Sequence, residues 1–104
     1  MAEMPKAPQT FEDFSKRFPS LADAWEKTAM AAKEGPLDEK TARLVKLGIA
    51  IGAMQQGAIH ASGRKALALG ATWEELDQVV ALTAGTLGFP SAVAAFTMLR
   101  DLAD

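Results

Sequence analysis

Two short turns divide the second half of the chain into runs that favour helix, and they constrain the fold more than any other feature. The turns lie at residues 70–72 (Gly-Ala-Thr) and 88–90 (Gly-Phe-Pro). The glycine of the first turn has the position of a left-handed C-cap, and its threonine can form a capping box with Glu75. No stretch alternates between apolar and polar residues with a period of two. The sequence therefore predicts an all-α fold.

The spacing of caps and helix breakers predicts about six helices. A first helix capped by Thr10 should end one residue before Pro19, because proline disfavours helical backbone at the residue before it. Ser20, together with Asp23, would cap a second helix that ends near residues 35–36, and Asp38 would cap the third. The fourth helix is expected over residues 55–69, the fifth from 72 to 88, and the sixth from 90 or 91 onward.

Apolar stripes at helical spacing predict which side chains are buried. On the third helix the expected buried face consists of Thr41, Leu44, Val45, Gly48 and Ile51. On the last helix it consists of Val93, Phe96, Met98, Leu99 and Leu102. The methionines and phenylalanines as a group are expected in the core. The small residues at the end of the third helix, Gly48, Gly52 and Ala53, indicate a close approach between helices there.

Length and charge exclude several classes of protein. With 104 residues the chain has room for one domain, which we expect over residues 10–104 after a loose leader at 1–9. A domain this small buries a modest core, so a homo-oligomer is expected. The formal net charge of −2 does not indicate the excess of positive charge that is typical of nucleic-acid-binding proteins. No apolar run has the length of a membrane span or a signal peptide, which predicts a soluble cytoplasmic protein.

The chain contains no cysteine. Disulfides, thiolate metal sites and cysteine nucleophiles are therefore excluded, and the composition fits a reducing compartment. A metal site is not expected, because a single histidine would need carboxylates at ligand spacing and none faces it on the same helix. The expected chemistry needs no cofactor.

Three motifs carry a resemblance to a known family. They are Leu37-Asp38 before a helix, the pattern GAT-x-EE at residues 70–75, and GFP-x-A at residues 88–92. Over residues 37–104 the chain resembles the carboxymuconolactone decarboxylase family, which includes the alkylhydroperoxidase-D-like proteins. The resemblance implies a helical domain that assembles into an oligomer, as a trimer or a hexamer.

The redox-active members of that family carry a Cys-x-x-Cys-x-x-x-His motif on the helix before the GAT turn and a glutamate on the preceding helix. Counted back from Gly70 without gaps, the motif falls on Gln55, Ala58 and Ser62, and the glutamate falls on Arg43. Thiol peroxidase activity, although typical of the family, therefore lacks its nucleophile. A register shifted by two residues would place His60 on the family histidine, and would need an irregularity in the helix, for which Gly63 is a candidate.

His60 is the only histidine, and it is the candidate general acid or base because its ordinary pKa lies near neutrality. The candidate substrate-binding residues are Arg43, Gln55, Gln56, Ser62 and Arg64. Structural interpretations stand beside these: His60 as a hydrogen-bonded core or interface residue, the glutamines as helix surface, and Arg43 as a solvated charge paired with Glu39.

Two classes of function fit these residues. The first is an enzyme that resembles the lactone decarboxylase branch of the family, a lyase acting without thiols on a small carboxylated, lactone-like molecule by acid/base chemistry. The second is a non-catalytic homo-oligomeric module that binds a small molecule or a protein. The residues alone leave both open.

Overall fold

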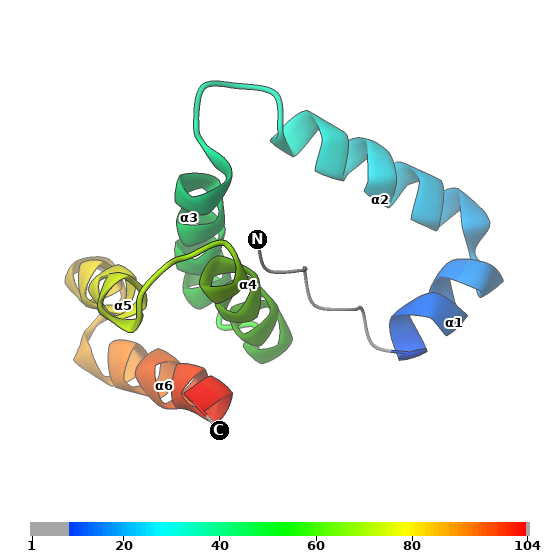
Figure 1. Cartoon of the computed structure of the whole chain (residues 1–104). Coiled ribbons are helices and arrows are strands. Elements are labelled where there is room, and N and C mark those ends of the chain that lie inside the picture. The colour runs from blue at the N-terminus through cyan, green and yellow to red at the C-terminus, as the bar shows by residue number, and fades with distance from the viewer. Residues whose placement is uncertain (1–8, 104) are drawn as a thin grey trace. The chain divides into compact units, whose positions relative to one another are not determined.

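The computed structural model describes residues 9–103, which form six α-helices and a final 3₁₀ turn (Figure 1). The elements are α1 (Gln9–Arg17), α2 (Pro19–Ala32), α3 (Glu39–Gly52), α4 (Gln56–Ala68), α5 (Trp73–Leu87), α6 (Phe89–Arg100) and η1 (Asp101–Ala103). No strand occurs among the described residues, so the prediction of an all-α fold with six helices is confirmed. None of these helices is long and apolar enough to span a membrane.

The chain divides into two compact units, one ending at Leu37 and the other beginning at Asp38. The described part of the first unit holds α1 and α2, and that of the second holds α3 to η1. The leader predicted for residues 1–9 lies outside the described residues except for Gln9, which already belongs to α1. The single domain expected over residues 10–104 stays a prediction.

The two helices of the first unit are separated by Phe18, whose backbone is not helical (φ −128°, ψ 73°). The end of α1 before Pro19 is thereby confirmed. The predicted caps are wrong: Thr10 lies inside α1, and α2 begins at Pro19, because proline is pre-organised for the first helical positions. Neither helix contains a buried residue. We call this pair of helices the α1–α2 arm.

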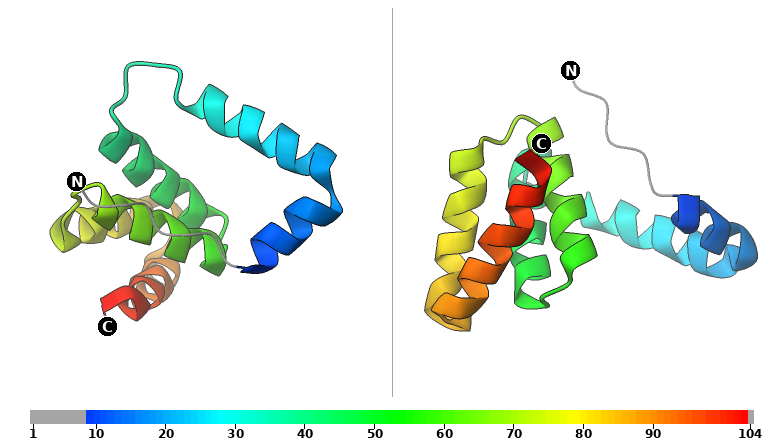
Figure 2. Two further views of the ribbon diagram at one scale, coloured as in Figure 1. Left: turned by 45° about the vertical axis from the view of Figure 1, so that its right-hand side comes forward. Right: turned by 90° about the horizontal axis from the view of Figure 1, so that it is seen from below.

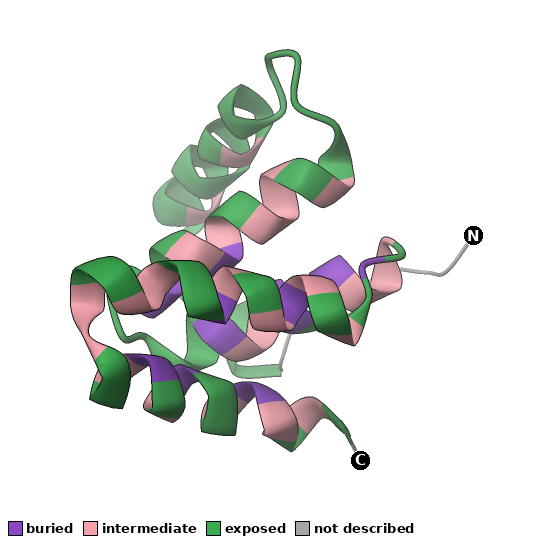
Figure 3. Ribbon diagram, turned by 90° about the vertical axis from the view of Figure 1, so that its left-hand side faces the viewer, coloured by how far each residue is buried: buried purple, intermediate pink, exposed green. Residues whose placement is uncertain are grey.

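The core of the second unit lies between α3, α4, α5 and α6, whose buried residues follow one strip of each helix (Figure 3). Its largest fully buried side chains are Leu47, Ile51, Ile59, Leu76 and Leu99. Neighbouring helices pair as α3 with α4 and α5 with α6 (Figure 2). A Cβ atom added at Gly63 of α4 would lie 2.8 Å from methyl groups of both Leu99 and Leu102, so this glycine permits close packing of α4 against the C-terminal segment.

The predicted buried faces are only partly correct. Ile51 and Leu99 are fully buried, but Val45, Val93 and Phe96 are exposed, and small residues such as Ala50, Ala92 and Ala95 face the core in their place. Alanines on the inner strips let the helices approach closely, which leaves the larger side chains at the edges.

The expectation that phenylalanines and methionines form the core is wrong for most of them. All five phenylalanines are at least 41% exposed, and Met30 and Met54 are 65% and 39% exposed. Phe96 has a structural role at the surface, because its ring lies 4.0 Å from the guanidinium carbon of Arg100. Arg100 in turn donates to both carboxylate oxygens of Asp77 at 2.9 Å and thereby joins α6 to α5.

The connection from α4 to α5 follows its sequence prediction. Gly70 has a positive φ of 95°, and the amides of Gly70 and Ala71 bond to the carbonyls of Leu67 and Ala66, which is the Schellman pattern. The capping box is present in both directions between Thr72 and Glu75. The turn from α3 to α4 differs, because it contains Met54 with a φ of 50°, a conformation that costs a non-glycine residue free energy.

Candidate functional site

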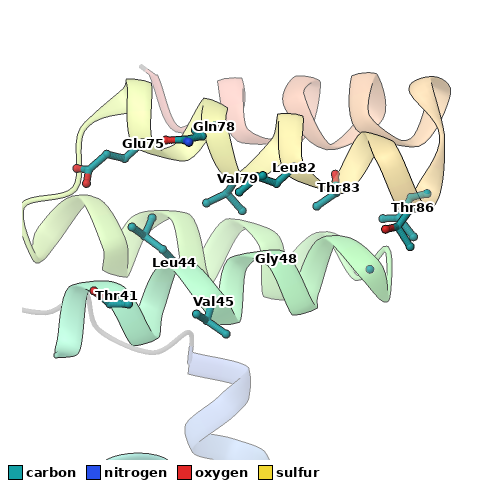
Figure 4. A pocket seen from close by; sticks show the side chains of 12 residues that line it. Thr41, Leu44, Val45, Gly48, Glu75, Gln78, Val79, Leu82, Thr83 and Thr86 are labelled. Carbon is teal, nitrogen blue, oxygen red and sulfur yellow. The ribbon is translucent and has the colours of Figure 1, made fainter. Parts of the chain in front are cut away.

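A groove of about 580 Å³ lies between α3 and α5 (Figure 4). The residues that line it are Thr41, Leu44, Val45, Gly48, Gly52, Glu75, Gln78, Val79, Leu82, Thr83, Thr86 and Leu87. In Figure 4, Val79 and Leu82 extend from α5 toward α3. The volume lies in the range of about 300–1,000 Å³ that is usual for small-molecule sites.

The groove exists because α3 presents glycines where α5 presents larger side chains. A Cβ atom at Gly48 would lie 3.8 Å from Cγ1 of Val79, an ordinary contact distance, and a Cβ atom at Gly52 would meet nothing within 4 Å. The close helix approach predicted at these residues is therefore absent on this side of α3. The small residues leave space there, and the close approach occurs at Gly63 instead.

Polar groups lie at the edges of the groove, and its one charged lining residue is neutralised. Glu75 forms an ion pair with Lys40 at 3.1 Å and accepts the backbone amide of Thr72 at 2.9 Å. The amide of Thr72, and then Lys40, hold the pKa of Glu75 below its usual value of 4.5. Glu75 therefore stays ionised and paired near neutral pH, which leaves an apolar groove with hydroxyl and amide groups at its rim.

His60 lies away from this groove, on the side of α4 that faces the end of α6. Its Nε2 is 3.0 Å from the carbonyl oxygen of Met98 and 3.0 Å from Oδ2 of Asp101. Because a carbonyl and a carboxylate oxygen are both acceptors, the proton is assigned to Nε2, which donates to them. The side chain is 22% exposed. This geometry ties α4 to the C-terminal segment.

The α4 helix is unbroken through Gly63. An irregularity there, which the two-residue shift of register required, is therefore absent. In the gapless register Ser62 takes the place of the family histidine, and Ser62 is buried, at 6% exposure, in the helix face that packs on the core.

The other predicted site residues are distributed over the α3–α4 pair. Gln55 and Gln56 are exposed at the start of α4, and Arg64 is exposed further along it. Arg43 is partly buried on α3, and burial lowers its pKa. The ion pair expected between Arg43 and Glu39 is not among those formed by residues 9–103.

The structure does not bring the predicted catalytic and binding residues into one site. None of His60, Arg43, Gln55, Gln56, Ser62 and Arg64 lines the groove. On α4, His60 and Lys65 lie about 140° apart around the helix axis, so His60 faces α6 while Lys65 is placed toward α3. Within residues 9–103 no group of three or more His, Asp or Glu side chains could hold a metal ion. The catalytic and binding roles of the six residues stay predictions.

The sequence interpretation missed the groove residues on α5, of which Leu82 is 71% exposed. A signal for them was present. The apolar and small residues of α3 and α5 cover more of each helix than one core-facing stripe, and a second stripe on both helices indicates a second apolar surface.

Comparison with known proteins identifies the fold. The model of the carboxymuconolactone decarboxylase family matches residues 19–101, which confirms the resemblance noted from the sequence motifs and extends it toward the N-terminus. The crystal structure of apo-lpg0406, a carboxymuconolactone decarboxylase family protein from Legionella pneumophila, matches with a TM-score of 0.80 and 30% sequence identity, over 88% of this chain and 82% of that chain. No curated protein matches the chain. The chain belongs to the carboxymuconolactone decarboxylase family.

Proposed function

We propose that this chain is a homo-oligomeric binding module of the carboxymuconolactone decarboxylase family, and that a small, uncharged and largely apolar molecule binds in the α3–α5 groove. The observation that carries the proposal is the groove itself, with about 580 Å³ of space above a floor of glycines. Apolar side chains would supply most of the contact area, and the hydroxyls of Thr41 and Thr86 would orient a polar group of the ligand.

Charge argues for an uncharged ligand in this groove. Its one charged lining residue, Glu75, is an acid, and Lys40 already pairs with it. A carboxylated ligand placed there would meet a carboxylate and compete for Lys40. The carboxylated, lactone-like molecule expected from the family resemblance therefore gains no support from the groove.

Binding of the neutral dye Nile red tests the proposal. The wild-type protein is expected to raise the dye's fluorescence with saturation, and Gly48→Leu should weaken binding at least tenfold, because the leucine side chain would occupy the groove above Val79. Gly57→Leu is the matched control, since a Cβ atom at Gly57 of α4 meets nothing within 4 Å. Equal binding by wild type and Gly48→Leu, or no binding by the wild type, would overturn the assignment of the groove.

Self-association is supported by the α1–α2 arm. Its exposed large apolar side chains include Phe14, Leu21, Trp25 and Met30, with 51–65% of their surface accessible. Helices of 9 and 14 residues without a buried residue have little stability of their own in water, so contact with a second copy would supply the missing packing.

Light scattering tests this part of the proposal. The wild type is expected to have a multiple of the 11.0 kDa chain mass, and the double variant Leu21→Glu/Trp25→Glu should lower that mass. Phe89→Glu is the control, because Phe89 is 75% exposed but belongs to α6. A monomeric wild type at micromolar concentration, or an unchanged mass in the double variant, would refute a role of the arm in assembly.

Acid/base chemistry at His60 on a small carboxylated, lactone-like molecule is the second candidate function. One observation favours it: the carboxylate of Asp101 lies 3.0 Å from Nε2 of His60, so that Nδ1 could accept a proton while Asp101 orients the ring. Against it, His60 lines neither the α3–α5 groove nor the pocket between α1 and α2. Turnover of a carboxymuconolactone by the wild type and its loss in His60→Gln would support this candidate, whereas no turnover by the wild type would reject it.

A further inference from the structure

A pair of cations lies at one level of the α3–α4 hairpin. Arg43 is nine residues before Gly52, where α3 ends, and Lys65 is nine residues after Gln56, where α4 begins. At a rise of 1.5 Å per residue both are about 13–14 Å from the turn, and α3 and α4 pack directly against each other (Figure 2). The two side chains therefore lie side by side on adjacent helices, and Arg64 precedes Lys65 on α4.

These cations have no acidic partner within hydrogen-bonding reach in residues 9–103. The ion pairs of this part of the chain join Lys27 to Asp23, Lys40 to Glu75, His60 to Asp101 and Arg100 to Asp77, and none involves Arg43, Arg64 or Lys65. Arg43 and Lys65 are both partly buried. A charge that is partly removed from water without a partner costs free energy.

Electrostatics support the proximity of these groups. Burial lowers the pKa of Lys65, and the positive charges of Arg43, Lys46 and Arg64 lower it further. Like charges that are held close together repel each other, so their proximity costs the fold free energy. Clustered ionisable groups with shifted pKa values are more frequent at binding sites than elsewhere.

We propose that Arg43, Arg64 and Lys65 form a binding site for a small oxyanion, a phosphate or carboxylate group. The guanidinium of Arg43 can donate two parallel hydrogen bonds to two oxygens, Lys65 adds a compact charge from α4, and Arg64 closes the site from its exposed position. The site is separate from the α3–α5 groove, because Arg43 and Gly48 lie about 140° apart around α3. It does not depend on the proposed function, and Gly48→Leu should leave it intact.

Titration of the full-length protein with inorganic phosphate and, separately, with malonate tests the site, by calorimetry and by thermal melting at an ionic strength matched with sodium chloride. The wild type is expected to bind at least one of the two with a dissociation constant in the millimolar range or below. Tighter binding of phosphate would identify a phosphate site, and tighter binding of malonate a carboxylate site.

Variants separate binding in the cluster from the general stabilising effect of such salts on proteins. Lys65→Met and Arg43→Met keep most of the apolar stem and remove the charge, and each should weaken binding at least tenfold. Lys27→Met is the control, because Lys27 is an exposed lysine of the arm paired with Asp23. If Arg43→Met fails to fold, Lys65→Met decides alone. Equal responses of wild type and Lys65→Met, or responses no larger than with chloride, would overturn the proposal.

Discussion

Gly63→Ala should destabilise the protein although alanine is the better helix former. Gly63 lies inside α4, where replacing glycine with alanine gains up to about 1 kcal/mol in an open position. Here the new methyl group would lie 2.8 Å from a methyl carbon of Leu102 and 2.8 Å from one of Leu99. Carbon atoms pack best at about 3.5–4.0 Å, so both leucines must move by roughly 1 Å.

The change in the free energy of unfolding is the difference between the cost of overpacking and the gain in helix propensity. Overpacking of a well-packed core costs about 1–3 kcal/mol. Leu99 is fully buried and has little room to move, so a cost in the upper half of this range is expected, near 2 kcal/mol. After the gain in helix propensity, we expect a net loss of about 1 kcal/mol, or roughly 4–8 °C in the midpoint of thermal unfolding.

Urea denaturation followed by circular dichroism, with Gly57→Ala as the matched control, measures this loss. Gly57 lies on the same helix, and a Cβ atom there would meet nothing within 4 Å, so Gly57→Ala should be neutral or stabilising. The two substitutions are chemically identical and should have effects of opposite sign. If Gly63→Ala stabilised the protein as much as Gly57→Ala does, the close packing of α4 on Leu99 and Leu102 would be refuted.

The remaining predictions concern hydrogen bonds, charges and chemistry. His60→Ala should lower the free energy of unfolding by about 1–3 kcal/mol, because it removes the donor to the Met98 carbonyl, and an unchanged urea midpoint would contradict this. Because the pKa of Lys65 is lowered in the fold, the folded chain loses this proton before the unfolded chain does as the pH rises toward 10.5, and the destabilising effect of the charge fades over that range. Lys65→Met should therefore be more stable than wild type at neutral pH, with the difference shrinking in melts at higher pH. The pKa of Glu75 is lowered in the fold, so its contribution to stability is present above pH 4.5 and is lost as the pH falls below it. Glu75→Gln, which can still accept the Thr72 amide but no longer ionises, should flatten this acid dependence in melts. With no cysteine, the protein should not accelerate peroxide consumption by a dithiol, and sustained turnover above the uncatalysed rate would contradict that reasoning.

The local signals in the sequence predicted the helices and one connection well. The Schellman turn at Gly70, the capping box of Thr72 with Glu75 and the cap at Asp38 depend on neighbouring residues only, and all three are present. The cap predicted at Ser20 is misplaced because Pro19 sets the backbone there, and the one predicted at Thr10 is misplaced because Thr10 lies inside α1. A proline at the first helical positions makes a side-chain cap at the next residue unnecessary.

Burial was harder to predict, because it depends on which side of a helix its neighbours occupy. Val45 and Ile51 belong to one apolar band in the sequence, yet Ile51 is in the core and Val45 lines the groove. The contacts of the candidate site residues were hard to predict for the same reason. The sequence identified His60 as the only histidine, but its partners, Met98 and Asp101, are distant in the chain and only the folded structure reveals them.

The glycine floor of the α3–α5 groove has a consequence for ligand selectivity. At Gly48 and Gly52 a methyl group would meet at most ordinary contacts, so larger residues could be introduced there without moving the helices. Each carbon atom added to the side chain at these positions would take up the space of about one carbon atom of the ligand. Because the core lies on another side of α3, substitutions at these two residues could change the length of ligand that the groove accepts while the stability of the fold stays nearly constant. Close homologues with the same fold could in this way come to prefer ligands of different size.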